Sequence, residues 1–295
     1  KIGFIGLGVM GRPMARRLLE AGYSLYGCAN VSEIDPELIA AGLKVCDSPA
    51  EVASHSQLLI TMLPDTPDVE RVLLGKQGAL ENLRPGSLII DMSSISPAAS
   101  RGFAHRAYER GCEYLDAPVS GGHLGAEQGT LSIMVGGNEQ SFERALPVFE
   151  ILGRNITRVG EVGSGQVCKI ANQIIVGLNI EAVAEALVFA ARSGADPARV
   201  RKALMGGFAS SRVLEVHGEK MLERRFEPGF RVDLQRKDLN LALDAARELG
   251  IALPNTAGTL QLFNALAAQE GGGDLDHSAL VRVLEALAGS PVSDA

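Results

Sequence analysis

The N-terminal segment GFIGLGVMG most constrains the fold of this chain. It places Gly6, Gly8 and Gly11 in the spacing G-x-G-x-x-G, between an apolar run and an amphipathic stretch over Met10–Glu20. In a strand-turn-helix unit, the first glycine permits a tight turn, the second lets the backbone approach a pyrophosphate, and the third lets the helix pack on the strand. Backbone amides at the start of the helix then face the phosphates. The residues of this turn that we expect at a dinucleotide are Gly6, Leu7, Gly8, Val9, Met10 and Gly11.

Short apolar runs alternate with helical patterns from residue 1 to about residue 160. Such alternation is typical of a twisted, mostly parallel sheet covered by helices. The amphipathic stretches include Met10–Glu20 and Pro97–Arg110. The strands that we expect are Ile2–Ile5, Tyr23–Cys28, Gln57–Met62, Ser87–Met92, Glu113–Leu115, Leu131–Val135 and Ile156–Val159. This half of the chain is therefore predicted to be an α/β domain of the Rossmann type.

The pattern becomes helical after Gly163. Apolar residues recur at spacings of three and four through 165–193, with no proline and with Gly177 as the only internal glycine. This predicts one long helix that ends at Gly194, with further helices after it. We expect a dinucleotide-binding Rossmann domain over 1–162, a long connecting helix over 163–194, and an all-helical substrate and oligomerisation domain over 195–290.

Composition narrows the classes of partner. The 295 residues carry a formal net charge of -7, and no stretch concentrates Lys and Arg. We therefore expect small molecules and further copies of the chain as partners, and neither nucleic acid nor a membrane. No uninterrupted apolar run approaches the ~20 residues of a membrane span. The opening segment KIGFIG lacks the basic and apolar regions of a signal peptide, so a soluble, cytoplasmic protein is expected.

The spacing of cysteines and histidines does not favour a metal site. The four cysteines are far apart and form no C-x-x-C pair, which predicts reduced thiols. His55, His105 and His123 are isolated and are interpreted as surface residues. His217 and His277 are interpreted as caps or inter-helix hydrogen-bonding groups. We expect no bound metal.

A second glycine loop follows a predicted strand in YLDAPVSGG, residues 114–122. At the carboxyl edge of a doubly wound sheet, Ser120, Gly121 and Gly122 would present a hydroxyl and free amides, which suits a small carboxylate. An ordinary turn explains this segment equally well.

The segment GSGQVCKIANQ, residues 163–173, places Lys169 where the long helix should bury its apolar side. A charge there is costly unless it is paired, hydrated or used. Asn172 follows three residues later, so both side chains share one face of the helix. The two can therefore reach one region of a substrate.

The expected end of the second strand decides the choice between NAD and NADP. NAD sites usually place an acid there for the ribose hydroxyls, but YSLYGC is followed by Ala29 and Asn30. The absence of that acid removes its repulsion of a 2'-phosphate, and Asn30, Ser32 and Arg12 could contribute polar contacts. Both cofactors remain open, with a slight preference for NADP.

Four segments in this order and spacing resemble the β-hydroxyacid dehydrogenase family, which includes 3-hydroxyisobutyrate dehydrogenase. They are GFIGLGVMG, DAPVSGG, GSGQVCKIANQ and KDL at Lys237–Leu239. Further segments, among them MLPDTPDVERVL, DMSSISP, GTLSIMVGG and LDHSAL, are most similar to the members that reduce tartronate semialdehyde. The resemblance covers nearly the whole chain. It implies a Rossmann-type domain joined by a long helix to an all-α domain, as in 6-phosphogluconate dehydrogenase.

The resemblance also implies roles for particular residues. Lys169 would be the catalytic acid/base, and Asn172 would assist catalysis and hold the substrate. Ser120, Gly121 and Gly122 would bind the substrate carboxylate. The activity implied is the reversible, NAD(P)H-dependent reduction of tartronate semialdehyde to D-glycerate.

Further implied contacts concern the cofactor. Leu63, Pro64 and Ser94 would lie along it, and Lys237 would approach the nicotinamide side. The chain departs from its relatives at Ala29-Asn30, where they often have Asp or an Asn-Arg pair. Relatives are commonly dimers or tetramers, which implies a homo-oligomer.

Two alternatives stay open. The motifs discriminate poorly among 3-hydroxyisobutyrate, glyoxylate and succinic semialdehyde, which all pair a carboxylate with a reducible carbonyl or its alcohol. A non-catalytic module that senses dinucleotides would need neither Lys169 nor Asn172 nor the second glycine loop.

Overall fold

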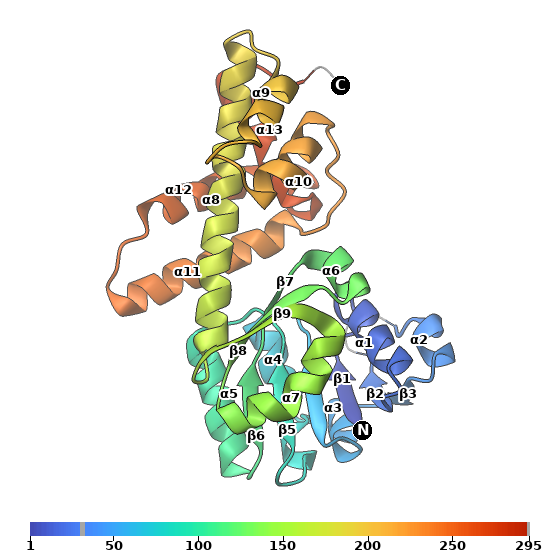
Figure 1. The fold of residues 1–295 in the computed structure, drawn as a ribbon. Coiled ribbons are helices and arrows are strands. Elements are labelled where there is room, and N and C mark those ends of the chain that lie inside the picture. The colour runs from blue at the N-terminus through green and yellow to red at the C-terminus, as the bar shows by residue number, and fades with distance from the viewer. Residues whose placement is uncertain (30–32, 294–295) are drawn as a thin grey trace. The chain divides into compact units, whose positions relative to one another are not determined.

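The structure is a computed structural model that describes residues 1–29 and 33–293. The chain divides into two compact units, Lys1–Lys169 and Ile170–Ala295, each described here by itself (Figure 1). The boundary falls inside one long helix. The proposed functional division at residues 162 and 194 stays a prediction.

One sheet forms the centre of the first unit. Its strand order is β3-β2-β1-β4-β5-β6-β8-β7, with β9 paired to β8. Neighbours from β3 to β6 are parallel, whereas β8 runs antiparallel to β6 and β7. The strands are β1 (Ile2–Ile5), β2 (Leu25–Cys28), β3 (Lys44–Cys46), β4 (Leu58–Thr61), β5 (Leu88–Asp91), β6 (Glu113–Asp116), β7 (Val119–Ser120), β8 (Leu131–Gly136) and β9 (Gly153–Gly160). The predicted Rossmann-type sheet is confirmed.

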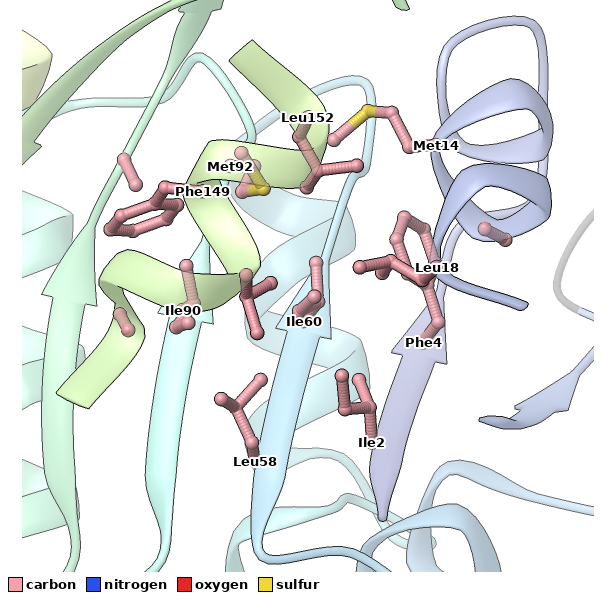
Figure 2. Packing of buried hydrophobic residues seen from close by; sticks show 14 of the residues in the cluster. Ile2, Phe4, Met14, Leu18, Leu58, Ile60, Ile90, Met92, Phe149 and Leu152 are labelled. Carbon is pink, nitrogen blue, oxygen red and sulfur yellow. The ribbon is translucent and has the colours of Figure 1, made fainter. Parts of the chain in front are cut away.

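Helices cover this sheet. They are α1 (Gly11–Glu20), α2 (Pro36–Ala40), α3 (Pro49–Ser54), α4 (Thr66–Leu74), α5 (Pro97–Glu109), α6 (Gly122–Gln128) and α7 (Glu139–Leu152), with a 3-10 turn η1 (Leu80–Asn82). Figure 2 shows Ile90 of β5 near Phe149 of α7, and Phe4 of β1 beside Leu18 of α1. Burial of this apolar surface stabilises the sheet at roughly 25 cal/mol per Å², and its rigid edge carries the loops considered below.

Two strands and several short helices were not predicted. β3 and β7 contain three and two residues, too few to reveal a period, and Lys44 and Val45 of β3 are exposed. The helices α2 and α3 have five and six residues and begin with a proline after a capping Asp35 or Ser48. Such short elements depend on their neighbours more than on local sequence.

The second unit is helical. After α8 (Ser164–Arg192), which begins in the first unit, come α9 (Pro197–Leu204), α10 (Arg212–Leu222), α11 (Val232–Leu249), α12 (Pro254–Ala267), η2 (Gly272–Asp274), η3 (His277–Leu280) and α13 (Val281–Ala288). Its core includes Ile180, Leu187, Leu239 and Phe263. Asp196 and Ser211 cap α9 and α10 by accepting hydrogen bonds from first-turn amides.

The helix α8 is the long helix expected from the periodicity. By length and composition alone it is apolar enough to cross a membrane, a property hidden from a search for uninterrupted apolar runs. A core helix of a soluble protein passes the same test. The buried side chains of Gln166, Lys169 and Gln173 on α8 favour a core helix, because polar groups are costly inside lipid.

The four cysteines form no disulfide. Cys28 and Cys46 are partners on the adjacent strands β2 and β3, yet both are free. Burial raises the pKa of Cys28 to about 11, and the neighbouring Cys46 adds to the effect. Both behave as packing residues rather than as reactive thiolates.

Candidate functional site

The last residues of four parallel strands form one row at the carboxyl edge of the sheet. Ile5 of β1 pairs with Thr61 of β4, Thr61 with Asp91 of β5, and Asp91 with Asp116 of β6. The loops that follow these strands carry most of the residues predicted at the site: the Gly6–Gly11 turn, Leu63, Pro64, Ser94 and Ser120–Gly122. Ligands of doubly wound sheets bind outside this edge. The structure therefore brings these loops to one edge.

Each glycine of the first turn has a different environment. Gly6 has a φ of +102°, and a Cβ there would lie 2.2 Å from the carbonyl oxygen of Met62. A Cβ on Gly11 would lie 1.8 Å from the carbonyl oxygen of Gly6, so the start of α1 packs directly on the turn. A Cβ on Gly8 would meet no protein atom within 4 Å. Protein packing thus requires the outer two glycines but leaves the middle one free for another purpose.

The start of α1 can receive an anion. The residue before it, Met10, makes no side-chain cap, and the first turn contains no acid. Uncapped amides and the helix dipole together favour a negative group at this end. The pyrophosphate that the glycine spacing predicts is such a negative group.

An ion pair joins α1 to the residue before α2, at the corner of the unit where the adenosine ribose is expected. Arg12 Nη1 lies 2.9 Å from Asp35 Oδ2, and the other oxygen of Asp35 accepts a hydrogen bond of 2.9 Å from the backbone N–H of Glu37. These contacts lower the pKa of Asp35, chiefly through the backbone hydrogen bond. Asn30 and Ser32 lie outside the described residues. Arg12 is thus a cation at this corner, and it has an acidic partner.

Both glycines of the second glycine loop have a positive φ. Gly121 and Gly122 have φ values of +133° and +62°, in the left-handed region that favours glycine. Ser120 ends β7, where it pairs with Ser132 of β8, and its side chain is half-buried. The sheet therefore fixes the hydroxyl-bearing residue beside two backbone amides.

A buried carboxyl group that sequence reasoning missed supports the loops that carry Leu63 and Ser94. Asp91 Oδ1 accepts hydrogen bonds from Thr61 Oγ1 at 2.9 Å and from the backbone N–H of Ser93 at 3.1 Å, and Oδ2 accepts one from the Tyr114 hydroxyl at 3.2 Å. Ser93 Oγ in turn accepts a hydrogen bond of 2.9 Å from the backbone N–H of Leu63. The loops that carry Leu63 and Ser94 are thereby tied together.

Burial sets the ionisation of this group. Asp91 is fully buried, and desolvation raises its pKa to about 6, although hydrogen bonds from Ser93, Thr61 and Tyr114 oppose the shift. The carboxyl is therefore ionised at neutral pH and becomes protonated in mild acid. The sequence shows DMSS as the end of a strand, but nothing local distinguishes this aspartate from an exposed one.

A second carboxyl group holds the start of the helix that carries Lys169. Asp116 Oδ1 accepts a hydrogen bond of 2.7 Å from the backbone N–H of Gly163, and Oδ2 accepts one of 2.8 Å from Gln166. A Cβ on Gly165 would lie 2.7 Å from the carbonyl oxygen of Asp116. The GSG turn thus lets the helix start approach the end of β6.

Lys169 and Asn172 are on α8, three residues apart. Lys169 is 7% exposed and is the last residue of the first unit. In the second unit, Asn172 Nδ2 donates a hydrogen bond of 2.7 Å to Gln173 Oε1. Gln173 Nε2 donates one of 2.6 Å to Asp238 Oδ2, and Lys237 Nζ lies 3.1 Å from Asp238 Oδ1. The amide of Asn172 therefore has a fixed orientation.

His217 and His277 make the inter-helix contacts that we expected of them. Their Nε2 atoms lie 3.2 Å apart, and His277 Nδ1 lies 3.3 Å from Gln235 Oε1. With Asp276 they form a group whose ligand atoms are close enough for a metal ion. The Asp276 carboxylate, however, already accepts hydrogen bonds from Lys220, Gly229, Phe230 and Ser278. This arrangement fits a structural hydrogen-bond centre better than a cation site.

Of the other three histidines, His55 and His105 are exposed as predicted, whereas His123 is half-buried. His55 stacks on Tyr26 with ring centroids 4.8 Å apart. His105 Nε2 lies 3.4 Å from Glu109 Oε1, one helical turn later. His123 Nδ1 lies 3.7 Å from Glu127 Oε1, also one turn later.

Comparison with known families covers both units. A family model described as the NAD binding domain of 6-phosphogluconate dehydrogenase matches residues 1–160. A model described as the NAD-binding of NADP-dependent 3-hydroxyisobutyrate dehydrogenase matches residues 163–284. A cofactor of the NAD or NADP type follows.

Individual relatives match over nearly their whole length. The chain is 56% identical over 288 residues to 2-hydroxy-3-oxopropionate reductase of Escherichia coli (strain K12), covering 98% of each. It is 41% identical over 294 residues to 2-(hydroxymethyl)glutarate dehydrogenase of Eubacterium barkeri, covering 99% of this chain and 97% of the relative. A structure of Mycobacterium tuberculosis 3-hydroxyisobutyrate dehydrogenase with L-serine has a TM-score of 0.87 and 34% identity, covering 96% of this chain and 98% of that one. The chain therefore belongs to the 3-hydroxyisobutyrate dehydrogenase family and is an NAD(P)-dependent oxidoreductase.

Proposed function

We propose that this enzyme catalyses the reversible, NAD(P)H-dependent reduction of tartronate semialdehyde (2-hydroxy-3-oxopropanoate) to D-glycerate, with Lys169 as general acid/base. The observation that carries the proposal is the 56% identity, across both units, to a 2-hydroxy-3-oxopropionate reductase. The loops at the carboxyl edge of the sheet support it, because they offer an anion-binding helix start and a hydroxyl beside two glycine amides.

The proton chemistry is assigned to Lys169. Bound nicotinamide supplies the hydride, and its transfer to an aldehyde leaves negative charge on the carbonyl oxygen. An ammonium at Lys169 Nζ polarises that oxygen and donates a proton as the charge develops, an effect typically worth ~10² to 10⁴ in rate. In the reverse direction the neutral amine accepts the proton from the alcohol.

Binding and orientation are assigned to the polar groups nearby. The hydroxyl of Ser120 and the amides of Gly121 and Gly122 would hold the substrate carboxylate. Asn172, whose amide donates to Gln173, would place its remaining polar atoms toward the substrate. Leu63, Pro64, Ser94 and Lys237 are proposed to contact the cofactor.

The preference between NADH and NADPH is proposed to be slight and in favour of NADPH. The strand β2 ends without an acid, and Arg12 provides a cation at the ribose corner. Asp35 weakens the preference, because a 2'-phosphate would compete with it for the guanidinium.

The Eubacterium barkeri relative and the Mycobacterium tuberculosis structure support a second candidate, reduction or oxidation of another small hydroxyacid pair of this family. A steady-state comparison of tartronate semialdehyde, succinic semialdehyde, glyoxylate and the 3-hydroxyisobutyrate couple, with both cofactors, separates the candidates. We expect the highest kcat/KM for tartronate semialdehyde. A higher kcat/KM for another member of the panel would replace the proposed substrate.

The role of Lys169 is tested by Lys169→Ala at saturating cofactor, with the exposed Lys202→Ala as a matched control. We expect kcat to fall by ~10² to 10⁴ in Lys169→Ala and to stay unchanged in Lys202→Ala. An unchanged kcat in Lys169→Ala would remove the acid/base assignment. Cofactor binding without turnover of any short semialdehyde would favour a dinucleotide sensor.

We also propose that the enzyme forms a cytoplasmic homo-oligomer. The large apolar side chains of Ile175 and Phe189 on α8 are 62% and 73% exposed, which is costly in a monomer. Light scattering after size exclusion should give a mass of a dimer or a tetramer. A monomer mass at micromolar concentration would contradict this.

A further inference from the structure

We propose that Gln166 is a positioning residue, which sets Lys169 against the Ser93–Ile95 loop by clamping the backbone on both sides of Ser94. The inference rests on the proposed function, because it assumes that Lys169 is the acid and that the loop containing Ser94 contacts the cofactor. Every contact that carries it lies within the first unit.

The side-chain amide of Gln166 uses both of its ends on this loop. Gln166 Nε2 donates a hydrogen bond of 2.8 Å to the carbonyl oxygen of Ser93, and Gln166 Oε1 accepts one of 3.0 Å from the backbone N–H of Ile95. A carbonyl at one residue and an N–H two residues later is the pair that a neighbouring strand would engage. The amide therefore imitates a strand partner and fixes the backbone around Ser94.

The backbone of Gln166 is anchored separately. Its N–H donates a hydrogen bond of 2.8 Å to Asp116 Oδ2, and Asp116 Oδ1 holds Gly163 at 2.7 Å. The first turn of α8 is thus fixed to the end of β6 by its backbone and to the loop after β5 by the Gln166 side chain. Two anchors on one turn define both its position and its rotation about the helix axis.

Lys169 follows Gln166 by three residues and lies on the same face of α8. The rise of 1.5 Å per residue places it about 4.5 Å along the axis, so any rotation of the first turn moves the Lys169 side chain. The Ser93 end of the clamp is itself fixed, because Asp91 accepts the Ser93 N–H and Ser93 Oγ accepts the Leu63 N–H. Gln166 thereby links the helix of the proton donor to both cofactor loops.

Packing alone does not explain a glutamine at this position. The side chain is 1% exposed, where an apolar residue of the same length would fill the space without the desolvation of an amide. The amide satisfies two backbone groups that would otherwise be buried without partners. These hydrogen bonds are compatible with a purely structural role of Gln166 and with a positioning role. The two roles predict different effects on the rate of hydride transfer.

The distinguishing experiment uses Gln166→Met and Gln166→Glu in the full-length enzyme, measured well below the Tm of each variant. The methionine removes both hydrogen bonds, whereas the glutamate keeps an acceptor for Ile95 but turns an oxygen toward the Ser93 carbonyl. Asn179→Leu is the matched control, because its amide donates to the Ile175 carbonyl on the same helix and ties no other segment to it among the described residues. We expect the single-turnover rate of hydride transfer from saturating cofactor to fall on the order of 10- to 100-fold in both Gln166 variants. The KM for the aldehyde should change by less than about 3-fold, and Asn179→Leu should match the wild type in both quantities.

Coupling to Lys169 supplies the second readout. If Gln166 acts through Lys169, Gln166→Met should change the rate little in a Lys169→Ala background, where the donor is already absent. An unchanged rate in Gln166→Met, or the same factor of loss in both backgrounds, would overturn the inference.

The outcomes also separate the inference from the proposed function. A fast Lys169→Ala variant would remove the proposed acid, and with it the basis for this role of Gln166. A slow Lys169→Ala variant, combined with the same factor of loss from Gln166→Met in both backgrounds, would leave the proposed function intact. That result would reduce Gln166 to a residue that stabilises the loop.

Discussion

Asp116 and Gly163 are 47 residues apart in the chain, yet Asp116 Oδ1 accepts a hydrogen bond of 2.7 Å from the Gly163 N–H. The contact fixes the entry of α8 at the end of β6. The carboxylate satisfies amides that have no partner within the helix, as an N-cap residue would do from a neighbouring position. Its burial raises the pKa of Asp116, although hydrogen bonds from Gly163 and Gln166 oppose the shift.

Replacement of Asp116 by asparagine should therefore damage both folding and catalysis. One of the two acceptor atoms becomes an NH2 group facing a backbone N–H, which should cost about 1 to 3 kcal/mol of unfolding free energy. Urea unfolding should report this loss, and kcat should fall because the turn before Lys169 loses an anchor. The exposed Asp244→Asn serves as the control. Wild-type stability in Asp116→Asn would show that the contact contributes little.

The two outer positions of the first glycine turn should respond differently from the middle one. Gly8→Ala should leave the Tm near that of the wild type, since its Cβ meets no protein atom within 4 Å, but should weaken NADH and NADPH binding. Gly6→Ala should lower the Tm or prevent folding, because of its φ of +102° and a contact of 2.2 Å with Met62. Thermal unfolding and fluorescence titration measure the two effects. Equal cofactor affinity in Gly8→Ala and the wild type would contradict the proposed pyrophosphate contact.

Asp91 should make stability depend on pH in the mildly acidic range. Its folded pKa of about 6 lies above the usual 3.8, so the folded state binds a proton more tightly than the unfolded state does. Its contribution therefore favours folding at low pH and is lost as the pH rises from about 4 to about 6, by an amount on the order of 2 to 3 kcal/mol. Asp91→Asn should remove this dependence in unfolding measurements from pH 4 to 7. An identical pH profile in the variant would assign the dependence to other groups.

Asp276 should act in the opposite direction. Burial alone would raise its pKa, but His277, Ser278 and Lys220 outweigh burial and hold the pKa of this carboxyl well below its usual range. Its stabilising contribution is therefore full above the unfolded pKa near 4 and is lost as the pH falls below it. Asp276→Asn should destabilise the helical unit at neutral pH, with the difference from the wild type shrinking in acid. Hydrogen exchange of the amides in 212–293 measures this difference in stability. Equal protection of these amides in the two proteins at pH 7 would refute the prediction.

Much of the fold was predictable because its signals are local. The strand from Ile2 to Ile5 was predicted with its observed bounds, and the other predicted strands lie within a few residues of theirs. The helix α8 follows from a spacing of three and four over 29 residues. The shortest strands, β3 and β7, were missed because two or three residues carry no period.

The residues of the candidate site also divide into those that a local motif reveals and those that it does not. Gly6, Ser120 and Lys169 stand in motifs that can be recognised in the sequence. Asp91 and Gln166 lie in equally visible segments, but their roles depend on partners elsewhere in the chain, such as Ser93 at 73 residues from Gln166. A local pattern contains no information about such partners.

Local patterns in the sequence were enough to predict the α/β unit, the helical unit after Gly163 and the positions of the glycine turns, because periodicity and turn chemistry act between near neighbours. The folded structure was needed to show that Thr61, Asp91 and Asp116 end three adjacent strands in one row. It alone showed that two buried carboxylates and the Gln166 amide connect this row to the helix that carries Lys169. The physical reason is that strand order and register bring together hydrogen-bonding groups that are distant in the chain, and burial makes each of those groups depend on its partner.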